Sequence, residues 1–489
     1  MNARPVRLGP RLQADPRRVI AKLYVPGEEA SDSESRVHLI VDRVRELTVE
    51  QVKIEFDAIR DRFSHRHRDF EAILERHAAL VSASLHQTQQ FSRERRLLVG
   101  AYLTHEFSVE GAALCNPSMV LHPDQSGVPV GQTRFMMSAR AIGEGHLSSV
   151  EFRTGIVWSG GIRIDDPGSY LSMGTRISRD SDKAMMASRL NDLGVDPATV
   201  SQVLSELPDV FTEAVLRRTM ADIHPHLLAR QAVQRAVQWV GYVATSQYDL
   251  SFPDSIPISE QLIWPSGAAE SHGMEDVRLV RFVDDDGTIV YHGTYTAYDG
   301  DHVAPHLLTT RDFQNYRLGS LAGPAARNKG MALFPRRVGG RYLALSRWDR
   351  ENISLATSLD GRLWECGQIV RSTVDPWEFI QVGNCGSPIE TEAGWLVLTH
   401  GVGPLRTYGI GAILLDLDEP DRVLAETASP LLEADAQERD GYVPNVVYSC
   451  GALLHGDTLT IPYGISDAAI GFAQIDLATV LKQMHRSLS

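Results

Sequence analysis

The sequence predicts a mainly β fold, a five-bladed β-propeller with a helical N-terminal region and a helical insertion. Short strand-like runs, separated by Gly and Pro, fill two stretches at about 112–160 and 262–480. Their turns are Asp-Gly or Gly-Gly pairs, as at Asp286-Gly287 and Gly339-Gly340, which are typical of β-hairpins. The units repeat loosely every roughly 50 to 65 residues, as propeller blades of about four strands do. About four to six such blades fit these stretches, and we predict five.

Outside these stretches the pattern predicts helices and a lead-in. Residues 1–35 are rich in Arg, Pro and Gly and then in acidic and Ser residues, which indicates a flexible lead-in. Residues 36–108 form a predicted helical N-terminal region, because apolar residues recur there at three-to-four spacing. The propeller catalytic domain then covers 109–489 and is interrupted at about 165–245 by the helical insertion. Within the insertion, Asp196-Pro197 is a favourable helix start.

Composition excludes some classes of protein. The 489-residue chain has a formal net charge of −14. Binding to nucleic acid needs clustered Lys and Arg, so we expect no nucleic-acid partner. A few basic groups focused in a cleft still allow an anionic substrate. The N-terminus lacks an apolar signal segment, and the run from Leu97 to Leu103 is too short to span a bilayer. We therefore expect a cytoplasmic protein with no membrane partner.

The four cysteines are scattered and have no metal-ligand spacing. We interpret them as reduced thiols. Cys385 lies in Gly383-Asn-Cys-Gly386, where a nucleophile is one interpretation and a small buried thiol is the simpler one. We expect no cofactor and a metal-independent mechanism.

The segment Ser271–Arg278 contains the first candidate for chemistry. It holds one His, two carboxylates and an Arg within eight residues, directly before an apolar run. A neighbouring cation lowers the pKa of a carboxyl group and partial burial raises it, so Asp276 could be tuned as a catalytic acid. The alternative is a polar surface loop with a salt bridge. Glu275 has no assigned role.

In a propeller, loops of successive blades converge on the central channel, so polar residues at strand ends can meet there. Arg327-Asn-Lys329 offers two cations and an amide, a combination suited to holding phosphate. Each residue taken alone could be an exposed loop group. The candidates at strand ends are Asn116, Arg140, Glu144, His146, Asp276, Arg278, Arg327, Asn328, Lys329, Arg347, Asp349, His400, Tyr408, Glu438 and Asp467.

An ordered series of motifs resembles glycoside hydrolase family 130. The motifs are Asn116-Pro-Ser, Met274-Glu-Asp-Val-Arg278, Asn328-Lys-Gly-Met-Ala-Leu-Phe-Pro335, Gly394-Trp-Leu-Val-Leu-Thr-His-Gly401, Gly411-Ala-Ile-Leu-Leu-Asp-Leu-Asp-Glu-Pro420 and Tyr463-Gly-Ile-Ser-Asp467. That family comprises β-mannoside phosphorylases and β-1,2-mannosidases on a five-bladed β-propeller. The resemblance covers roughly residues 112–160 and 262–480. One departure is Val277, which stands where the family motif usually has Pro.

The resemblance implies roles for single residues. Asp276 would be the general acid, and its proton would pass through a sugar hydroxyl to the glycosidic oxygen. It implies substrate binding for Asn116, Arg140 and Asp467, which would hold the mannosyl unit, and for Tyr408. Phosphate binding is implied or favoured by charge for Arg327, Asn328, Lys329, Arg347 and His400.

The residues also bear on the choice between phosphate and water as the nucleophile. An inverting displacement by water needs a second carboxylate as base, whereas phosphate arrives ionised and needs cations. The cations and His400 favour phosphate, and Glu378 and Glu438 are candidate bases that keep hydrolysis open. We therefore predict an inverting glycoside phosphorylase that cleaves β-mannosides, of the manno-oligosaccharide or mannosyl-glucose type, to give mannose 1-phosphate. The alternatives are an inverting β-1,2-mannosidase and a non-catalytic carbohydrate-binding propeller.

The helical regions also suggest a homo-oligomer. Apolar-faced helices at 48–105 and 179–243 often pack between subunits, so we state self-association through them as a hypothesis.

Overall fold

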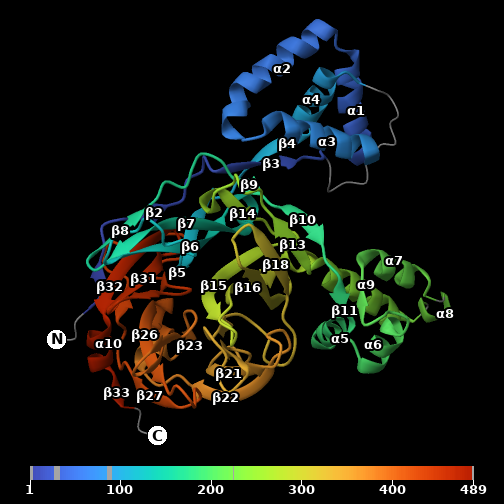
Figure 1. Cartoon of the computed structure of the whole chain (residues 1–489). Helices are drawn as coiled ribbons and strands as arrows, with labels where there is room; N and C mark the ends of the chain where they lie inside the picture. The colour runs from blue at the N-terminus through green and yellow to red at the C-terminus, as the bar shows by residue number, and fades with distance from the viewer. Residues whose placement is uncertain (1–3, 27–32, 85–90, 224, 229, 487–489) are drawn as a thin grey trace. The chain divides into compact units, whose positions relative to one another are not determined.

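The computed structural model describes residues 4–26, 33–84, 91–223, 225–228 and 230–486 (Figure 1). The chain is mainly β, with 39% strand and 26% helix, which confirms the predicted class. It divides into two compact units. The helical unit comprises Asp15–Gly111 and Gly168–Met173, and the β unit comprises Met1–Ala14, Ala112–Pro167 and Gly174–Ser489.

The helical unit packs four helices with a two-stranded sheet. The elements are α1 (Ser33–Glu46), α2 (Val49–Phe63), α3 (Phe70–Ser84), α4 (Arg93–Tyr102), β3 (Val19–Leu23) and β4 (Thr104–Ser108). Helix α2 begins after Thr48, whose hydroxyl accepts from the Gln51 backbone while the Gln51 side chain accepts from the Thr48 backbone. Buried Val41, Val52 and Leu98 belong to its apolar core. The prediction of helices in this region is confirmed.

The prediction of a flexible lead-in over residues 1–35 is wrong for the described residues 6–23. Strand β1 (Val6–Arg7) and strand β2 (Leu12–Gln13) pair antiparallel with β32 (Ala469–Asp476) of the β unit. Strand β3 pairs antiparallel with β4 inside the helical unit. These strands are two to five residues long, too short to give a periodic signal in the sequence.

The β unit begins with two antiparallel groups of strands that share one sheet. The first group is β5 (Ala113–Leu121), β6 (Gln132–Ile142), β7 (Ser148–Trp158) and β8 (Gly161–Ile164). The second is β15 (Gly273–Val283), β16 (Ile289–Tyr298), β17 (Val303–Thr310) and β18 (Asn315–Ser320). The two groups join where Gly273 of β15 pairs parallel with Ser148 of β7.

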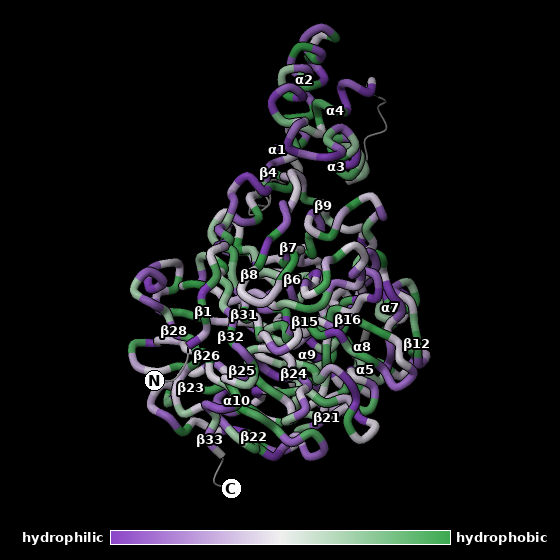
Figure 2. Tube along the Cα trace, turned by 60° about the vertical axis from the view of Figure 1, so that its left-hand side comes forward, coloured by the Kyte–Doolittle hydropathy of each residue, from purple (hydrophilic) through white to green (hydrophobic). Residues whose placement is uncertain are grey.

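Besides a two-stranded sheet of β11 (Ser181–Asp182) and β12 (Val210–Phe211), the described β unit contains three further antiparallel sheets. The first is β19 (Ala332–Leu333), β20 (Tyr342–Ser346), β21 (Ile353–Ser358) and β22 (Glu365–Arg371). The second contains β23 (Gln381–Asn384), β25 (Gly394–Val402), β26 (Tyr408–Leu415) and β27 (Val423–Glu426), and the third contains β29 (Val447–Tyr448), β31 (Thr458–Ile465) and β32. Every residue of β25 is buried, and Figure 2 shows hydrophobic stretches along the strands of this unit. Among the described residues no sheet closes on itself, so the five-bladed propeller stays a prediction.

The helical insertion belongs to the β unit. Its helices are α5 (Lys183–Asp192), α6 (Pro197–Leu204), α7 (Glu213–Ala221), α8 (Pro225–Leu228) and α9 (Gln231–Thr245). Asp196 caps α6 by accepting hydrogen bonds from the backbone of Ala198 and Thr199, as predicted. The insertion has its own apolar core, which includes Leu190 and Val240. In the part of the chain that the structure describes, no helix has the length and apolarity needed to cross a membrane.

Candidate active site

A polar cavity of about 520 Å³ lies in the β unit, within the size range of small-molecule sites. Five of its lining side chains are Arg or Lys and three are carboxylates. Its lining residues are Asn116, Arg140, Glu275, Asp276, Val303, Asn328, Lys329, Arg347, Arg350, Gln381, His400, Arg406, Tyr408, Val446, Tyr448 and Asp467.

The backbone around the cavity is strained at several lining residues. Asn116, Asp276 and Asp467 have φ of 50°, 56° and 49°, in the left-handed region that Asn and Asp tolerate better than other non-Gly residues. Asn116 and Asp276 also lie within register shifts of β5 and β15. Such backbone costs about 1–3 kcal/mol per residue and gathers at functional sites. Three more lining residues with positive φ are Asn328, Arg350 and Arg406.

We call the side with the three carboxylates the acid half of the cavity; it consists of Asn116, Arg140, Glu275, Asp276, Lys329 and Asp467. Asn116 Nδ2 donates to Asp276 Oδ1 over 2.6 Å. Arg140 Nη2 donates to Glu275 Oε1 over 2.9 Å, and Arg140 Nη1 lies 3.7 Å from Asp276 Oδ1. Lys329 forms an ion pair with Glu275. The cations in this half are therefore bound by carboxylates of the protein itself.

The two aspartates of the acid half differ in how they hold a proton. Burial favours the neutral form of Asp276, but the positive charges of Arg140, Arg278 and Lys329 outweigh it and lower the pKa of its carboxyl. Burial, together with the Asp276 charge, raises the pKa of Asp467 to about 6. Below about pH 6, Asp467 is therefore the protonated carboxyl of this pair and Asp276 is the one that favours the ionised form.

Arg278 is a buried residue outside the cavity lining that contacts two of the lining residues. It is 2% exposed and does not line the cavity. Its Nη1 donates to the Asp276 carbonyl oxygen over 3.0 Å, and its Nη2 donates to the Tyr448 hydroxyl over 2.6 Å. Its Nε donates to the carbonyl oxygen of Cys385, and burial raises the pKa of the Cys385 thiol to about 12. Arg278 therefore fixes the backbone of Asp276, and Cys385 is a buried, protonated thiol.

We call a second part of the lining the cationic half; it consists of Asn328, Arg347, Arg350, Gln381, His400, Arg406, Tyr408 and Tyr448. Of its cations, Arg406 also acts on Asp467 and opposes the rise of its pKa. Arg347 Nη1 donates to His400 Nε2 over 3.3 Å, and Arg347 Nη2 donates to the Arg350 carbonyl oxygen over 3.1 Å. The His400 ring contacts those of Tyr408 and Tyr448, with centroids 6.1 and 4.9 Å away. Burial and the Arg347 charge hold the pKa of His400 well below its usual range. The imidazole is therefore neutral.

Two glycines allow this arrangement. A Cβ on Gly383 would come within 2.5 Å of His400 Cε1 and 2.8 Å of Arg347 Cδ. A Cβ on Gly330 would lie 3.2 Å from Arg347 Cδ, and its φ of 94° disfavours any side chain. Arg347 is thus held between two backbone segments that only glycine permits.

The candidate bases Glu378 and Glu438 do not line the cavity. Glu378 Oε1 accepts from Arg371 Nη2 over 2.7 Å and from the Val374 backbone. Glu438 accepts from Arg7 and from the Tyr463 hydroxyl. The prediction that either could act as a base is therefore wrong. Among the described residues, neither Arg347 nor Arg350 forms an ion pair with a carboxylate.

A family model described as "beta-1,4-mannooligosaccharide phosphorylase", that of glycoside hydrolase family 130, matches residues 255–486. The 1,2-beta-oligomannan phosphorylase of Thermoanaerobacter sp. is 32% identical over 266 residues, which are 53% of this chain and 84% of that enzyme. The chain belongs to glycoside hydrolase family 130. It is therefore an enzyme of the glycoside phosphorylase and hydrolase class.

A second relative and a solved structure are also similar to this family 130 enzyme. The beta-1,2-mannobiose phosphorylase of Listeria innocua is 33% identical over 231 residues, 46% of this chain and 63% of that enzyme. The solved structure of that phosphorylase with beta-1,2-mannobiose has 22% identity and a TM-score of 0.46, over 77% of this chain and 92% of that one. The family model does not extend to residues 112–160, where the sequence also resembles the family.

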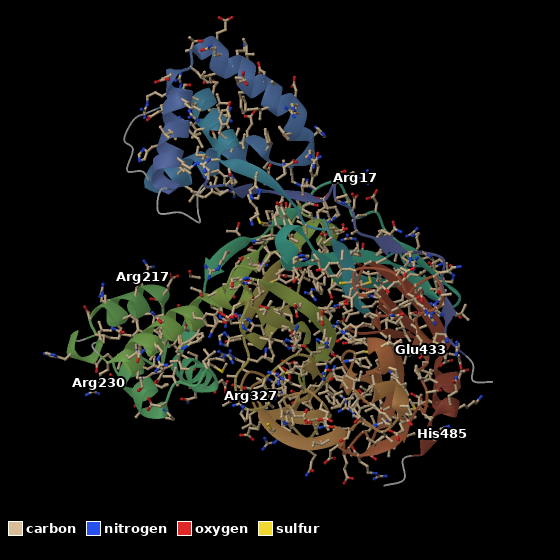
Figure 3. The ribbon with its side chains drawn as sticks, turned by 180° about the vertical axis from the view of Figure 1, so that it is seen from behind. Arg17, Arg217, Arg230, Arg327, Glu433 and His485 are labelled. Atoms are coloured by element: carbon tan, nitrogen blue, oxygen red, sulfur yellow. The ribbon has the colours of Figure 1, made fainter. Side chains whose placement is uncertain are left out.

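The structure gathers nine of the ten predicted site residues of this family 130 enzyme in one cavity. Arg327 is the exception, because it is exposed (Figure 3) and does not line the cavity. Its charge acts on Cys366, so the structure does not bring Arg327 together with the other residues predicted to bind phosphate. Lys329 lines the cavity, but it is paired with Glu275 in the acid half. The strand-end candidates outside the lining are Glu144, His146, Arg278, Arg327, Asp349 and Glu438.

Sequence reasoning missed several lining residues. Glu275 had no role, although it binds both Arg140 and Lys329. Arg350 and Arg406 line the cavity, and their own backbones have φ of 73° and 56°. No sequence signal predicts this left-handed conformation for Arg. The other residues missed are Val303, Gln381, Val446 and Tyr448.

Proposed function

We propose that this protein is an inverting glycoside phosphorylase that cleaves β-mannosides with inorganic phosphate to give mannose 1-phosphate. One observation carries the proposal: Arg347 lines the same cavity as the carboxylate pair, and its described hydrogen bonds go to His400 and to a backbone carbonyl. Phosphate needs cations to hold it and no protein base, whereas an attacking water needs a carboxylate. The cationic half meets the first requirement and lacks the second.

The acid half supports binding of the mannosyl unit and delivery of the proton. Asn116, Arg140 and Asp467 hold the mannosyl ring, and Asp276 provides the proton through a sugar hydroxyl to the glycosidic oxygen. An acid must be protonated near the working pH. The lowered pKa of Asp276 alone does not favour this, but its pair with Asp467 retains one proton up to about pH 6.

The cationic half supports binding of phosphate on the other face of the sugar. Arg347 offers a planar guanidinium that suits two oxygens of an oxyanion, and Arg350, His400 and Tyr408 surround it. A phosphate oxygen attacks the anomeric carbon while the bond from that carbon to the leaving oxygen breaks. The leaving oxygen takes the proton from the acid half, and the product carries phosphate with inverted configuration.

The names of the relatives bear on the linkage of the proposed substrate. The Listeria and Thermoanaerobacter relatives are named for β-1,2-linked mannose, which favours that linkage, and the family description names β-1,4-linked manno-oligosaccharides. A mannosyl-glucose substrate is a further candidate, because one relative is a 4-O-beta-D-mannosyl-D-glucose phosphorylase.

We also propose that the successive strand groups form five propeller blades around the cavity. Phosphorolysis retains the energy of the glycosidic bond in a sugar phosphate, which suits the expected cytoplasmic location.

The test uses the full chain with β-1,2-mannobiose or β-1,4-mannobiose, with and without inorganic phosphate. Mannose 1-phosphate and free mannose are quantified over time. We expect mannose 1-phosphate and an equal amount of mannose only when phosphate is present. Release of mannose at the same rate in both conditions would contradict phosphorolysis and support the hydrolase alternative.

A further inference from the structure

A second cavity, of about 200 Å³, lies in the β unit and shares no lining residue with the active site. We call it the seam pocket, because its lining comes from the sheet that contains β16, β17 and β18 and from the neighbouring sheet of β19 to β22. It is lined by Arg179, His292, Leu307, Thr309, Arg317, Gly319, Ser320, Leu321, Leu333, Tyr342, Asp360, Gly361 and Arg362.

Three guanidinium groups reach the seam pocket from three separate elements. Arg317 of β18 stands directly opposite Thr309 of β17, and Thr309 stands opposite His292 of β16, so all three side chains share one face of the sheet. Arg179 follows β10 (Thr175–Ser178), and its Nη2 lies 3.4 Å from where a Cβ on Gly319 would stand. Arg362 comes from the turn between β21 and β22.

The protein neutralises these arginines incompletely. Arg179 Nη1 and Arg317 Nε lie 3.8 and 3.9 Å from the same oxygen of Asp249, so one carboxylate serves two cations at long range. Within the described residues the Arg362 guanidinium has no ion-pair or hydrogen-bond partner. Burial and repulsion by the other two arginines lower the pKa of Arg179, although Asp249 opposes this. The Asp360 carboxylate accepts from the backbone of Arg362 and Leu363, and the Arg362 charge helps to lower its pKa, so the charge of Arg362 is compensated only in part.

We propose that the seam pocket binds a small oxyanion, either inorganic phosphate or the phosphate group of a sugar phosphate. Guanidinium groups recognise tetrahedral oxyanions through paired hydrogen bonds, and a chain with net charge −14 concentrates three of them here. The sugar-phosphate form of the proposal rests on the proposed function, because mannose 1-phosphate would be its product; the phosphate form does not.

The test is equilibrium dialysis of the full chain against radiolabelled phosphate and, in a second arm, against mannose 1-phosphate. Three variants separate the sites: R362Q for the seam pocket, R347Q for the active site, and R422Q as control. Arg422 is exposed and pairs only with Asp416 and Glu419 in the described residues. We expect two phosphates per wild-type chain and per R422Q chain, and one in each of the other variants.

R362Q is expected to weaken binding at the seam pocket by about tenfold or more, with phosphorolysis retained. Stronger binding of mannose 1-phosphate than of phosphate at the R362Q-sensitive site would identify the sugar phosphate as the ligand. The same number and affinity of sites in wild type and R362Q for both ligands would overturn the proposal. If phosphorolysis is not observed at all, an R362Q-sensitive phosphate site still supports the seam pocket, so the two proposals fail separately.

Discussion

The two halves of the active-site cavity use positive charge in opposite ways. In the acid half, Arg140 and Lys329 are bound to Glu275, and their charges also act on Asp276. In the cationic half, Arg347 donates to a neutral His400 and to a backbone carbonyl. Cations bound to carboxylates tune a proton, whereas a cation bound only to neutral groups can bind an anion. The comparison therefore separates proton delivery from nucleophile binding within one cavity.

The largest expected effect comes from removing the acid. Asp276→Asn keeps the shape of the acid half and removes its titratable group, so kcat should fall by about 10²–10⁴-fold, as for loss of a general acid. The KM or Kd of the mannoside should change little. Steady-state rates and calorimetric binding measure these quantities, with the exposed turn variant Asp286→Asn as control. Turnover at the wild-type rate would remove Asp276 from the mechanism.

The next effect comes from the cationic half. Arg347→Gln removes a charged donor from the proposed phosphate site, so kcat/KM for phosphate should fall by about 10- to 100-fold, the usual effect of a hydrogen bond to a charged group. Binding of the mannoside without phosphate should be unchanged. The matched control is Arg327→Gln, because Arg327 is exposed and outside the lining. Equal losses for both variants would contradict the division into two halves.

The pH dependence tests the carboxylate pair. Because the pKa of Asp467 is raised to about 6, the pair loses its proton as pH rises through that value, and kcat/KM should fall above about pH 6. In Asp467→Asn the remaining carboxyl is Asp276, whose pKa is lowered. The falling limb should therefore move to lower pH. A pH–rate profile of both proteins, checked for stability at each pH, measures the shift, and an unchanged limb would exclude the pair as the proton source.

The sequence alone predicts most of the residues that line the site. The lining residues that it does not predict are placed by local backbone geometry. The residue types at strand ends identified Asn116, Asp276 and Asp467, because motif and turn positions can be read directly. In the sequence, Ser271–Arg278 precedes an apolar run, but the strand β15 already begins at Gly273 and contains a bulge between Glu275 and Arg278. Arg327 and Lys329 are two residues apart, yet only Lys329 enters the cavity. Which neighbour turns inward depends on a positive φ at Asn328, which composition does not reveal.

Two further expectations are tested in solution. We expect self-association through the helical regions, which analytical ultracentrifugation of the full chain measures. In the described residues no group of three or more His, Cys, Asp or Glu side chains is placed to share a metal ion. Whether the reaction is independent of metal is a question for activity measured with and without a chelator.

The smallest expected effect comes from the helical insertion, which contacts the cavity wall outside both charged halves. Tyr242 of α9 donates to Asp299 Oδ2 over 2.7 Å, and Trp239 packs edge-on against His302 with ring centroids 5.5 Å apart. Asp299 also accepts from the backbone of the turn at Asp301 and His302. The next residue, Val303, lines the cavity. The insertion thus fixes the turn that carries one wall of the active site.

Tyr242→Phe removes one hydrogen bond from this support, worth about 0.5–1.5 kcal/mol or more because its partner is charged. We expect the KM for the mannoside to rise about two- to tenfold, with kcat and the KM for phosphate unchanged. The exposed Tyr102 of the helical unit provides the control variant Tyr102→Phe. If Tyr242→Phe lowered kcat without changing the KM for the mannoside, the insertion would act on the acid or cationic half. That result would contradict the distinction between the charged halves and the supporting wall.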